Sequence, residues 1–247
     1  MRDKAEELRR RVEERVRFLS DLGAGFVFRP EKREPAEATA PAQDRAAVAF
    51  RVTGKAADAD KASVLRPLEE AVRRCTLCRL SEGRRQAVTG EGTYDAPLMF
   101  VGEGPGADED LQGRPFVGRA GQLLTKIIAA MKFTREAVYI TNVVKCRPPG
   151  NRTPFQDEVE ACQPYLLTQI RTIRPRVIVA LGRPATGLFV PSASSMSDLR
   201  GKFVDFGGIP VMPTFHPSYV MRNEGDPRIK RLVWQDMQQV MTFLGKR

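Results

Sequence analysis

Residues 98–122 read LMFVGEGPGADEDLQGRPFVGRAGQ, and this stretch decides how the rest of the chain is interpreted. The apolar run 98–101 has the length and composition of one buried strand. It ends in the turn 102–106, whose glycines allow backbone angles that other residues resist. Carboxylates lie in and just after the turn, and a helical pattern of apolar residues follows from Gly118. Open α/β sheets bind ligands where a strand ends in such a turn before a helix, so we expect a functional site here.

Three more apolar runs predict strands, at residues 137–141, 176–181 and 209–214, and 203–206 is a candidate edge strand. Helical patterns separate them, with helices expected at 67–74, 118–131, about 153–173 and from 226 to the C-terminal region. This alternation predicts an α/β fold with a mostly parallel, four-stranded sheet. Glu103 follows the first strand, Asn142 ends the second and His216 follows the fourth. Because parallel strands end at one edge, we expect these three side chains to meet there.

The N-terminal quarter has a different character. Residues 1–28 predict an amphipathic helical arm, because apolar residues recur on one face from Ala5 to Leu19. Residues 29–62, rich in proline, alanine and charge, predict a disordered linker that cannot bury enough apolar surface to offset the entropy of ordering. The main domain is therefore expected at 63–247.

The chain is strongly basic, with a formal net charge of +10 and one histidine among 247 residues. Such a charge suits a polyanionic partner, because neutralising phosphates releases counterions. The sequence has no apolar run of about 18 residues, so no membrane span is expected. The charged start MRDKAEELRR lacks the apolar core of a signal peptide, so we expect a cytoplasmic protein.

The cysteines form one Cys-x-x-Cys pair and two distant single residues: Cys75, Cys78, Cys146 and Cys162. Structural disulfides are not expected in a reducing cytosol, so the thiols are candidate metal ligands. Zinc sites tend to use two tight pairs, whereas iron–sulfur sites accept thiolates gathered from far apart in sequence. The spacing therefore favours a [4Fe–4S] cluster and leaves zinc as the alternative.

Several motifs together resemble those of the family 4 uracil-DNA glycosylases. Residues 102–110 (GEGPGADED) and 113–121 (GRPFVGRAG) resemble the first motif of that family, and 141–149 (TNVVKCRPP) is similar to the second. Residues 216–223 (HPSYVMRN) resemble the DNA-probing loop, and the cysteines match the cluster ligands in order and spacing. The resemblance runs from about Arg66 to the C-terminus and does not cover the first 60 or so residues.

The resemblance implies a three-layer fold with helices on both faces of the sheet. It also implies excision of uracil from DNA, by hydrolysis of the N-glycosidic bond to leave an abasic site, as in base excision repair. A stacked base is out of reach of an enzyme and must first be flipped into a pocket. The implied partner is uracil-containing DNA, bound by a monomer, with a protein partner possible for the N-terminal arm.

The resemblance assigns uracil binding to Gly104, Phe116 and Asn142. The ring of Phe116 would stack on the extruded pyrimidine. The amide of Asn142 has both a donor and an acceptor, so it can pair with the edge of uracil and reject the amino group of cytosine.

The catalytic candidates are Glu103, Glu109 and His216. His216 would donate a hydrogen bond to the uracil carbonyl as negative charge grows there. Either glutamate could orient the attacking water and stabilise the cationic sugar; the tight turn favours Glu103 and leaves Glu109 open. Asp108 and Asp110 are expected to be solvated or to cap a helix.

For DNA contact, Tyr219, Val220 and Met221 resemble the wedge that fills the gap left by the flipped nucleotide. Phosphate contacts are expected from Ser218, Arg222 and the backbone amides near Gly118 and Gly121. We expect the cluster to be structural and to fix a basic surface near the DNA, made of Arg79, Lys145, Arg147 and Arg152.

Other classes of protein fit less well. A zinc base deaminase needs His-x-Glu and Pro-Cys-x-x-Cys motifs, but His216 precedes Pro-Ser and Cys75 follows Arg74. A relative that attaches covalently to DNA uses a histidine in an inserted loop, and residues 143–155 contain no histidine. A non-catalytic iron–sulfur DNA-binding protein remains the alternative.

Overall fold

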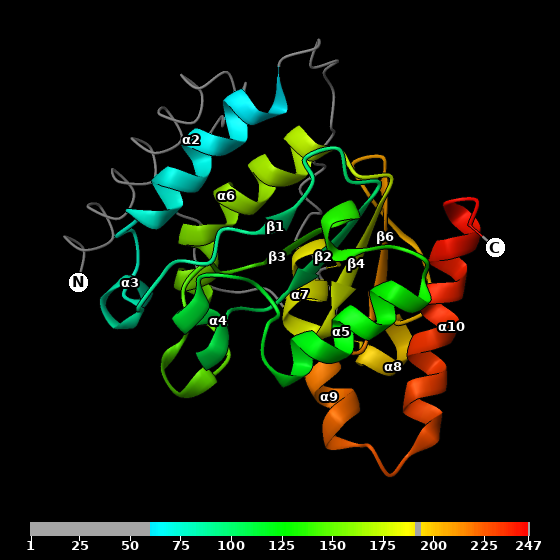
Figure 1. Ribbon diagram of the computed structural model, residues 1–247. Helices are drawn as coiled ribbons and strands as arrows, with labels where there is room; N and C mark the ends of the chain where they lie inside the picture. Colours follow the sequence, from blue (N-terminus) through cyan, green and yellow to red (C-terminus); the bar gives the residue numbers. More distant parts are fainter. Residues whose placement is uncertain (1–59, 191–193, 247) are drawn as a thin grey trace, which may run out of the picture. The chain divides into compact units, whose positions relative to one another are not determined.

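The computed structural model describes residues 60–190 and 194–246, all of which belong to the compact unit Val52–Arg247. The predicted helical arm (1–28) and the predicted linker up to residue 59 lie outside the described residues. Figure 1 shows the arrangement of the elements.

In the described part of the chain the strands form one six-stranded sheet, in the order β1-β3-β2-β4-β6-β5. Its central strands are parallel: β3 (Tyr139–Asn142), β2 (Leu98–Gly102), β4 (Val177–Leu181) and β6 (Ile209–Thr214). The predicted four-stranded parallel centre is confirmed, as is the edge strand β5 (Val204–Phe206), which pairs antiparallel with β6. The other edge strand, β1 (Glu91–Gly92), was not predicted, because two residues carry no periodicity.

Helices cover both faces of this sheet, which confirms the three-layer prediction. On one face α5 (Arg119–Ala130) and α10 (Pro227–Phe243) pack on the strands, with Leu124, Ile128 and Met237 in the main apolar core. On the other face lies α6 (Gln156–Ile173), whose Gln169 hydrogen-bonds to Tyr139 and Thr141 of β3. Figure 1 shows α2 (Lys61–Arg73) beside α6 on that side.

The remaining helices of the described residues are short: α3 (Leu80–Gly83), α4 (Ala107–Gln112), α7 (Gly182–Phe189), α8 (Met196–Leu199), α9 (Pro217–Arg222) and the 3-10 turns η2 (Arg135–Ala137) and η3 (Pro149–Asn151). Within residues 60–190 and 194–246, every helix is too short or too polar to cross a membrane.

Helix α2 begins earlier than its sequence pattern indicates. Asp60 caps it by accepting a hydrogen bond from the Ala62 N–H at 3.1 Å, and Pro67, which we expected at the helix start, lies inside it. The helix therefore crosses the domain boundary expected at residue 63. The cap is a single aspartate in a charged stretch, so it gave no distinct sequence signal.

The parallel strands bring their C-terminal ends to one side of the sheet, which we call the carboxyl edge: the residues that end or directly follow β2, β3, β4 and β6. Gly102 lies opposite Asn142 and Leu181 lies opposite Thr214 in the strand register. Figure 1 shows α4 and α9 leaving the sheet there. The predicted convergence of strand ends is therefore present in the fold.

Candidate active site and metal centre

A group of side chains meets at the carboxyl edge around Gly102. A Cβ atom on Gly102 would collide with both the Asn142 amide and the Phe116 ring. The ring of His216 lies beside Phe116, with ring centroids 5.7 Å apart and planes inclined by 34°. The fold therefore brings Phe116 close to Asn142 and to His216, although His216 lies 100 positions further along the sequence. We call Gly102, Phe116, Asn142 and His216 the Gly102 pocket.

Asn142 is almost fully buried at the end of β3, with 1% of its surface exposed. Its Oδ1 atom is buried and has no hydrogen-bond partner in the described part of the protein. Leaving a buried acceptor unsatisfied costs about 1–3 kcal/mol, and such atoms in native proteins call for an explanation. A ligand that donates a hydrogen bond to this oxygen would supply one.

His216 is the N-cap residue of α9, and its ring is fixed by Ser218. Its Nδ1 accepts from the Ser218 N–H at 3.1 Å and lies 2.7 Å from the Ser218 hydroxyl. Because Nδ1 is an acceptor, the proton of a neutral ring sits on Nε2. Burial, and to a lesser extent the Arg222 charge, lower the pKa of His216 from 6.5 to about 4. The side chain is therefore a neutral Nε2–H donor near pH 7.

Glu103 directly follows Gly102 and is half-buried. Its main-chain carbonyl accepts from the Val144 N–H at 3.1 Å, which ties the turn to the loop after β3. Burial raises the pKa of the Glu103 carboxyl, and a hydrogen bond from Thr153 opposes that rise. Glu103 is therefore next to Gly102 in the chain, and its carboxyl is held by Thr153.

Glu109 has a different role from Glu103. Its Oε1 accepts from the N–H groups of Val117 and Gly118, at 2.8 and 2.9 Å, and its Oε2 accepts from Gly106 at 3.1 Å. The carboxylate therefore joins the glycine turn to the start of α5. The amide of Gly118, which we expected to contact phosphate, is occupied by this bond.

The expectation for Asp110 was wrong. Its side chain is buried, with 3% of the residue exposed, and Oδ1 accepts from the Arg85 N–H at 2.9 Å. It holds the segment before β1 against α4. Asp108 is exposed, as expected.

Two glycines of the turn, Gly102 and Gly104, have different neighbours in the structure. A Cβ atom on Gly104 would lie 2.8 Å from Val144 Cγ2, so Gly104 packs against the loop after β3. The glycine that touches Phe116 and Asn142 is Gly102, which our sequence analysis did not single out. Its position as the last residue of a strand before the turn was the available signal.

The segment 217–222, expected as a loop, is the helix α9. Val220 has 2% of its surface exposed and belongs to the main core, so its assignment to a surface wedge was wrong. Tyr219 is exposed and stacks on Phe215, with centroids 4.9 Å apart. Met221 is half-buried and Arg222 is exposed, so both remain candidates for DNA contact. Because this segment is helical, one of its faces packs in the core and the other is exposed to solvent.

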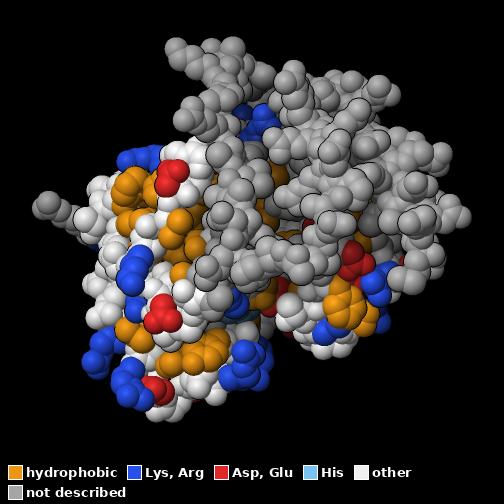
Figure 2. Space-filling view, turned by 180° about the vertical axis from the view of Figure 1, so that it is seen from behind, with side chains coloured by type: hydrophobic (Ala, Val, Ile, Leu, Met, Phe, Trp, Pro, Cys, Tyr) orange, Lys and Arg blue, Asp and Glu red, His pale blue; other side chains and the backbone are white. Residues whose placement is uncertain are grey.

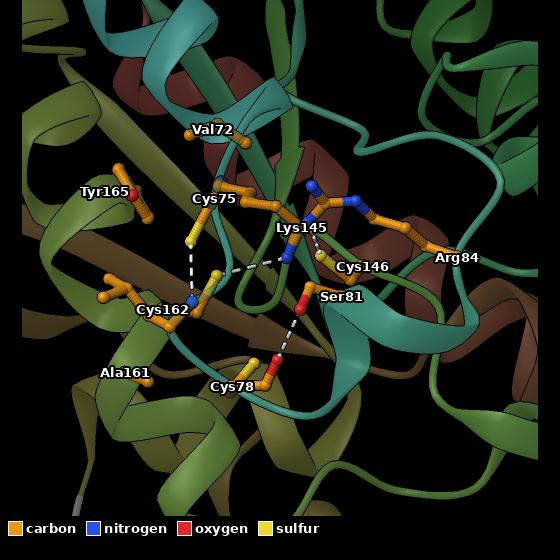
Figure 3. Close-up of a pocket in the computed structure, with 11 residues that line it drawn as sticks. Val72, Cys75, Cys78, Ser81, Arg84, Lys145, Cys146, Ala161, Cys162 and Tyr165 are labelled. Atoms are coloured by element: carbon orange, nitrogen blue, oxygen red, sulfur yellow. Dashed lines mark hydrogen bonds between the residues drawn. The ribbon is translucent and has the colours of Figure 1, made fainter. Parts of the chain in front are cut away.

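The four cysteines line one pocket (Figure 3). Cys75 follows α2, Cys78 precedes α3, Cys146 lies in the loop after β3, and Cys162 projects from α6. Backbone and side-chain N–H groups point at three of the sulfurs: Arg84 Nη1 to Cys146 at 2.9 Å, Lys145 N to Cys162 at 3.3 Å, and Leu77 N to Cys75 at 3.5 Å. Such N–H···S contacts are typical of sulfur ligands to iron–sulfur clusters.

Burial sets the electrostatics of the cysteine pocket. Burial raises the pKa of Cys78 to about 11 and that of Cys162 to about 12, so both are protonated near pH 7. Thiol ligands must lose their protons to bind a metal. Among residues 60–190 and 194–246, no three His, Cys, Asp or Glu side chains are grouped so that they could hold one metal ion.

Lys145 is not part of a basic surface, contrary to expectation. Its side chain is buried, and Nζ donates to Thr141 Oγ1 at 2.6 Å, to Gln169 Oε1 at 2.7 Å and to the Asn142 carbonyl at 2.8 Å. Burial lowers the pKa of Lys145 to about 8. Of the other expected surface cations, Arg79 and Arg152 flank the exposed ring of Phe155 (Arg152 Cζ is 3.8 Å from its centroid) and form ion pairs with acidic residues of α6.

Comparison with known proteins gives consistent matches. The family model described as "Uracil DNA glycosylase superfamily" matches residues 89–238. A type-4 uracil-DNA glycosylase from Thermotoga maritima is 49% identical over 181 residues, covering 72% of this chain and 94% of its own length. One from Saccharolobus solfataricus is 42% identical over 189 residues, covering 73% and 86%. A type-5 uracil-DNA glycosylase from Pyrobaculum aerophilum is 32% identical over 158 residues, covering 57% and 70%.

Proposed function

This chain belongs to the uracil DNA glycosylase superfamily and is a DNA glycosylase that excises uracil, and we propose that it does so with the Gly102 pocket and Glu103. It hydrolyses the N-glycosidic bond of uracil in DNA, leaves an abasic site, and acts in DNA repair. The predicted resemblance to the family 4 enzymes is confirmed by relatives that are 42–49% identical. For the site itself, the observation that carries the proposal is the buried, unsatisfied Oδ1 of Asn142 beside Phe116 and His216.

Asn142 reads the base in this proposal. Its Oδ1 accepts from the N3–H of a flipped uracil, and its Nδ2 donates to O4. Cytosine carries an acceptor at N3 and an amino group at C4, so both contacts would be lost and two buried polar groups left unpaired. Sites built on such hydrogen bonds reject the wrong partner by about 10⁴–10⁵-fold. Phe116 stacks on the pyrimidine ring, a contact worth about 1–3 kcal/mol.

His216 stabilises the departing base. Cleavage leaves negative charge on uracil, and the Nε2–H of His216 donates to the carbonyl oxygen on which that charge grows. A neutral donor serves here without a proton transfer. Removing one such donor typically slows catalysis by about 10²–10³-fold. The Ser218 contact to Nδ1 and the low pKa of His216 support this role.

Glu103 is the residue we assign to the water and to the cationic sugar. A carboxylate beside the sugar stabilises positive charge and can accept a proton from the attacking water. Glu109 is less suited, because three main-chain N–H groups already occupy its oxygens. The hydrogen bonds of Glu109 therefore support Glu103 as the residue that orients the water in this proposal.

We assign the direct DNA contacts to residues of α9. The net positive charge of the chain attracts DNA in general. Tyr219 and Met221 fill the space left by the flipped nucleotide, and Arg222 contacts a phosphate. Ser218 acts mainly through His216. We further propose a cytoplasmic enzyme that works as a monomer, because one chain supplies every residue of the Gly102 pocket. A protein partner for residues 1–28 remains a prediction.

The cysteine pocket is proposed to hold a [4Fe–4S] cluster. A single zinc ion needs its ligands to converge on one atom, and the described cysteines do not form such a group. In a cubane cluster each thiolate binds a different iron, so four thiols spread around one pocket suit it better. When bound, the cluster would supply a structural link between the end of α2, the loop after β3 and α6.

The test of the proposed activity is a cleavage assay. The purified protein is incubated with an oligonucleotide that contains one uracil, and abasic sites are then cleaved with alkali. We expect strand cleavage at the uracil and none when cytosine or thymine replaces it. Intact strands after incubation with iron-loaded protein that binds the oligonucleotide would instead favour the non-catalytic iron–sulfur DNA-binding protein.

A further inference from the structure

We propose that Arg135 is a positioning residue that holds Phe116 in place for the flipped uracil, although Arg135 itself does not line the Gly102 pocket. This inference rests on the proposed function of that pocket. It adds a residue from η2, outside the motifs that carry the family resemblance.

The first observation is the backbone of Phe116. Its φ angle is +52°, in the left-handed region that non-glycine residues enter only at a cost in free energy. The ring is nevertheless aimed at Gly102, beside Asn142 and His216. A strained conformation persists only where its surroundings impose it, so something must hold the Phe116 peptide.

The second observation is the guanidinium of Arg135. Nη1 donates to the Phe116 carbonyl at 3.0 Å, and Nη2 donates to the Pro115 carbonyl at 2.7 Å. Nη1 also donates to Thr125 Oγ1 in α5, and Nε donates to Glu91 in β1. The side chain is 12% exposed. A planar fork binds two successive carbonyls in a way that a lysine ammonium cannot reproduce.

The third observation is the packing of Phe116 against α5. A Cβ atom on Gly121 would collide with the carbonyl group of Phe116, so α5 lies directly against this peptide. Arg135 binds the same carbonyl oxygen and is itself anchored to α5 and β1. Contacts from two elements therefore fix the peptide, and its ring is directed into the pocket.

Arg114 provides a matched control. It also binds Glu91, through Nε at 2.9 Å and Nη2 at 3.0 Å, but its side chain is 59% exposed. Replacing Arg114 thus disturbs the same carboxylate without removing the bonds to the carbonyls of Pro115 and Phe116. A comparison of the two arginines separates positioning of Phe116 from a general effect on β1.

The experiment measures kcat and KM on a uracil-containing duplex, and inhibition by free uracil, for Arg135→Met, Arg135→Lys and Arg114→Met. We expect Arg135→Met to lower kcat/KM by about 10-fold and to weaken inhibition by free uracil by a similar factor, a part of what losing base stacking would cost. Arg135→Lys should lie near Arg135→Met, and Arg114→Met should stay within about 2-fold of wild type.

A double-mutant cycle with Phe116→Leu makes the test specific. If Arg135 acts through Phe116, Arg135→Met should have little further effect on kcat/KM in the Phe116→Leu background. Effects that multiply, or Arg114→Met losses equal to those of Arg135→Met, would overturn the inference. If Arg135→Met does not fold, Arg135→Lys is carried through the same cycle, and wild-type values for it would overturn the inference as well. An inactive wild-type enzyme would count against the proposed function instead.

Discussion

At the scale of single residues, the arrangement of the pocket depends on the absence of a side chain at Gly102. Its missing side chain is what allows the Asn142 amide and the Phe116 ring to meet. We predict that Gly102→Ala lowers kcat/KM by about 100-fold or more, because the added methyl group would displace the Asn142 amide and the Phe116 ring, and misplaced groups of this kind cost about 10²-fold. Gly187→Ala is the control, because a Cβ there meets nothing within 4 Å. Steady-state kinetics and urea unfolding of both variants check this; equal activity in the two would show that the pocket lies elsewhere.

Replacing Glu103 should mainly lower activity, whereas replacing Glu109 should mainly lower stability. Glu103→Gln removes a carboxylate proposed to act in the reaction, so we expect kcat to fall with little change in the free energy of unfolding. Glu109→Gln weakens hydrogen bonds to three main-chain N–H groups, so we expect a stability loss of about 1–3 kcal/mol. Kinetics and urea unfolding measured on the same preparations test both. The reverse pattern would exchange the two roles.

The lowered pKa of His216 leads us to predict that the stability of the protein depends on pH. Its pKa is about 4 in the folded protein and near 6.5 when unfolded, so between these values the unfolded chain binds the extra proton. The contribution of the neutral ring is therefore complete above pH 6.5 and is lost as pH falls toward 4, by up to about 1.4 kcal/mol per pH unit.

We expect His216→Gln to lose less stability than wild type between pH 6.5 and 4.5, as measured by urea unfolding. Because His216 is the only histidine in the chain, its pKa can also be read directly from one imidazole signal by NMR. A titration midpoint near 6.5 in the folded protein would contradict the buried, neutral ring.

At the scale of elements, Lys145 links strand β3 to helix α6 beside the cysteine pocket. Its ammonium donates to one acceptor from α6 and two from β3, so it is fully satisfied although buried. Replacing it by methionine removes these three buried hydrogen bonds, although Gln169 Oε1 still accepts from the Thr141 hydroxyl. We predict that Lys145→Met destabilises the fold by about 2–4 kcal/mol, measured by urea unfolding. Arg147→Met, on a half-buried side chain that bonds to Asn151, should change stability by less than about 1 kcal/mol; similar losses in both would contradict this role.

The strands were predictable because each is a short apolar run, and parallel strands end at one edge whatever the details of packing. Hence the placement of Asn142 and His216 at the same edge of the sheet followed from sequence alone. The roles of Glu109 and Lys145 did not follow, because each depends on partners from other elements that chain position does not reveal. Val220 was misassigned for a related reason: the face that a short helix turns to the core is set by its neighbours.

At the scale of the whole molecule, the carboxyl edge of the sheet belongs to a strongly basic chain. Figure 2 shows lysine and arginine side chains spread among apolar and acidic groups on one face, rather than gathered into one patch. A net charge of +10 favours DNA in general, and in our proposal the contacts of the Gly102 pocket supply the specificity for uracil. The most decisive test therefore concerns the pocket.

The most direct measurement is the single-turnover rate of uracil excision by wild type beside His216→Ala, with the free energy of unfolding measured for both. The account predicts rapid excision by wild type and a rate about 10²–10³-fold lower for a folded His216→Ala protein. A folded His216→Ala protein that excises uracil at the wild-type rate would contradict the account.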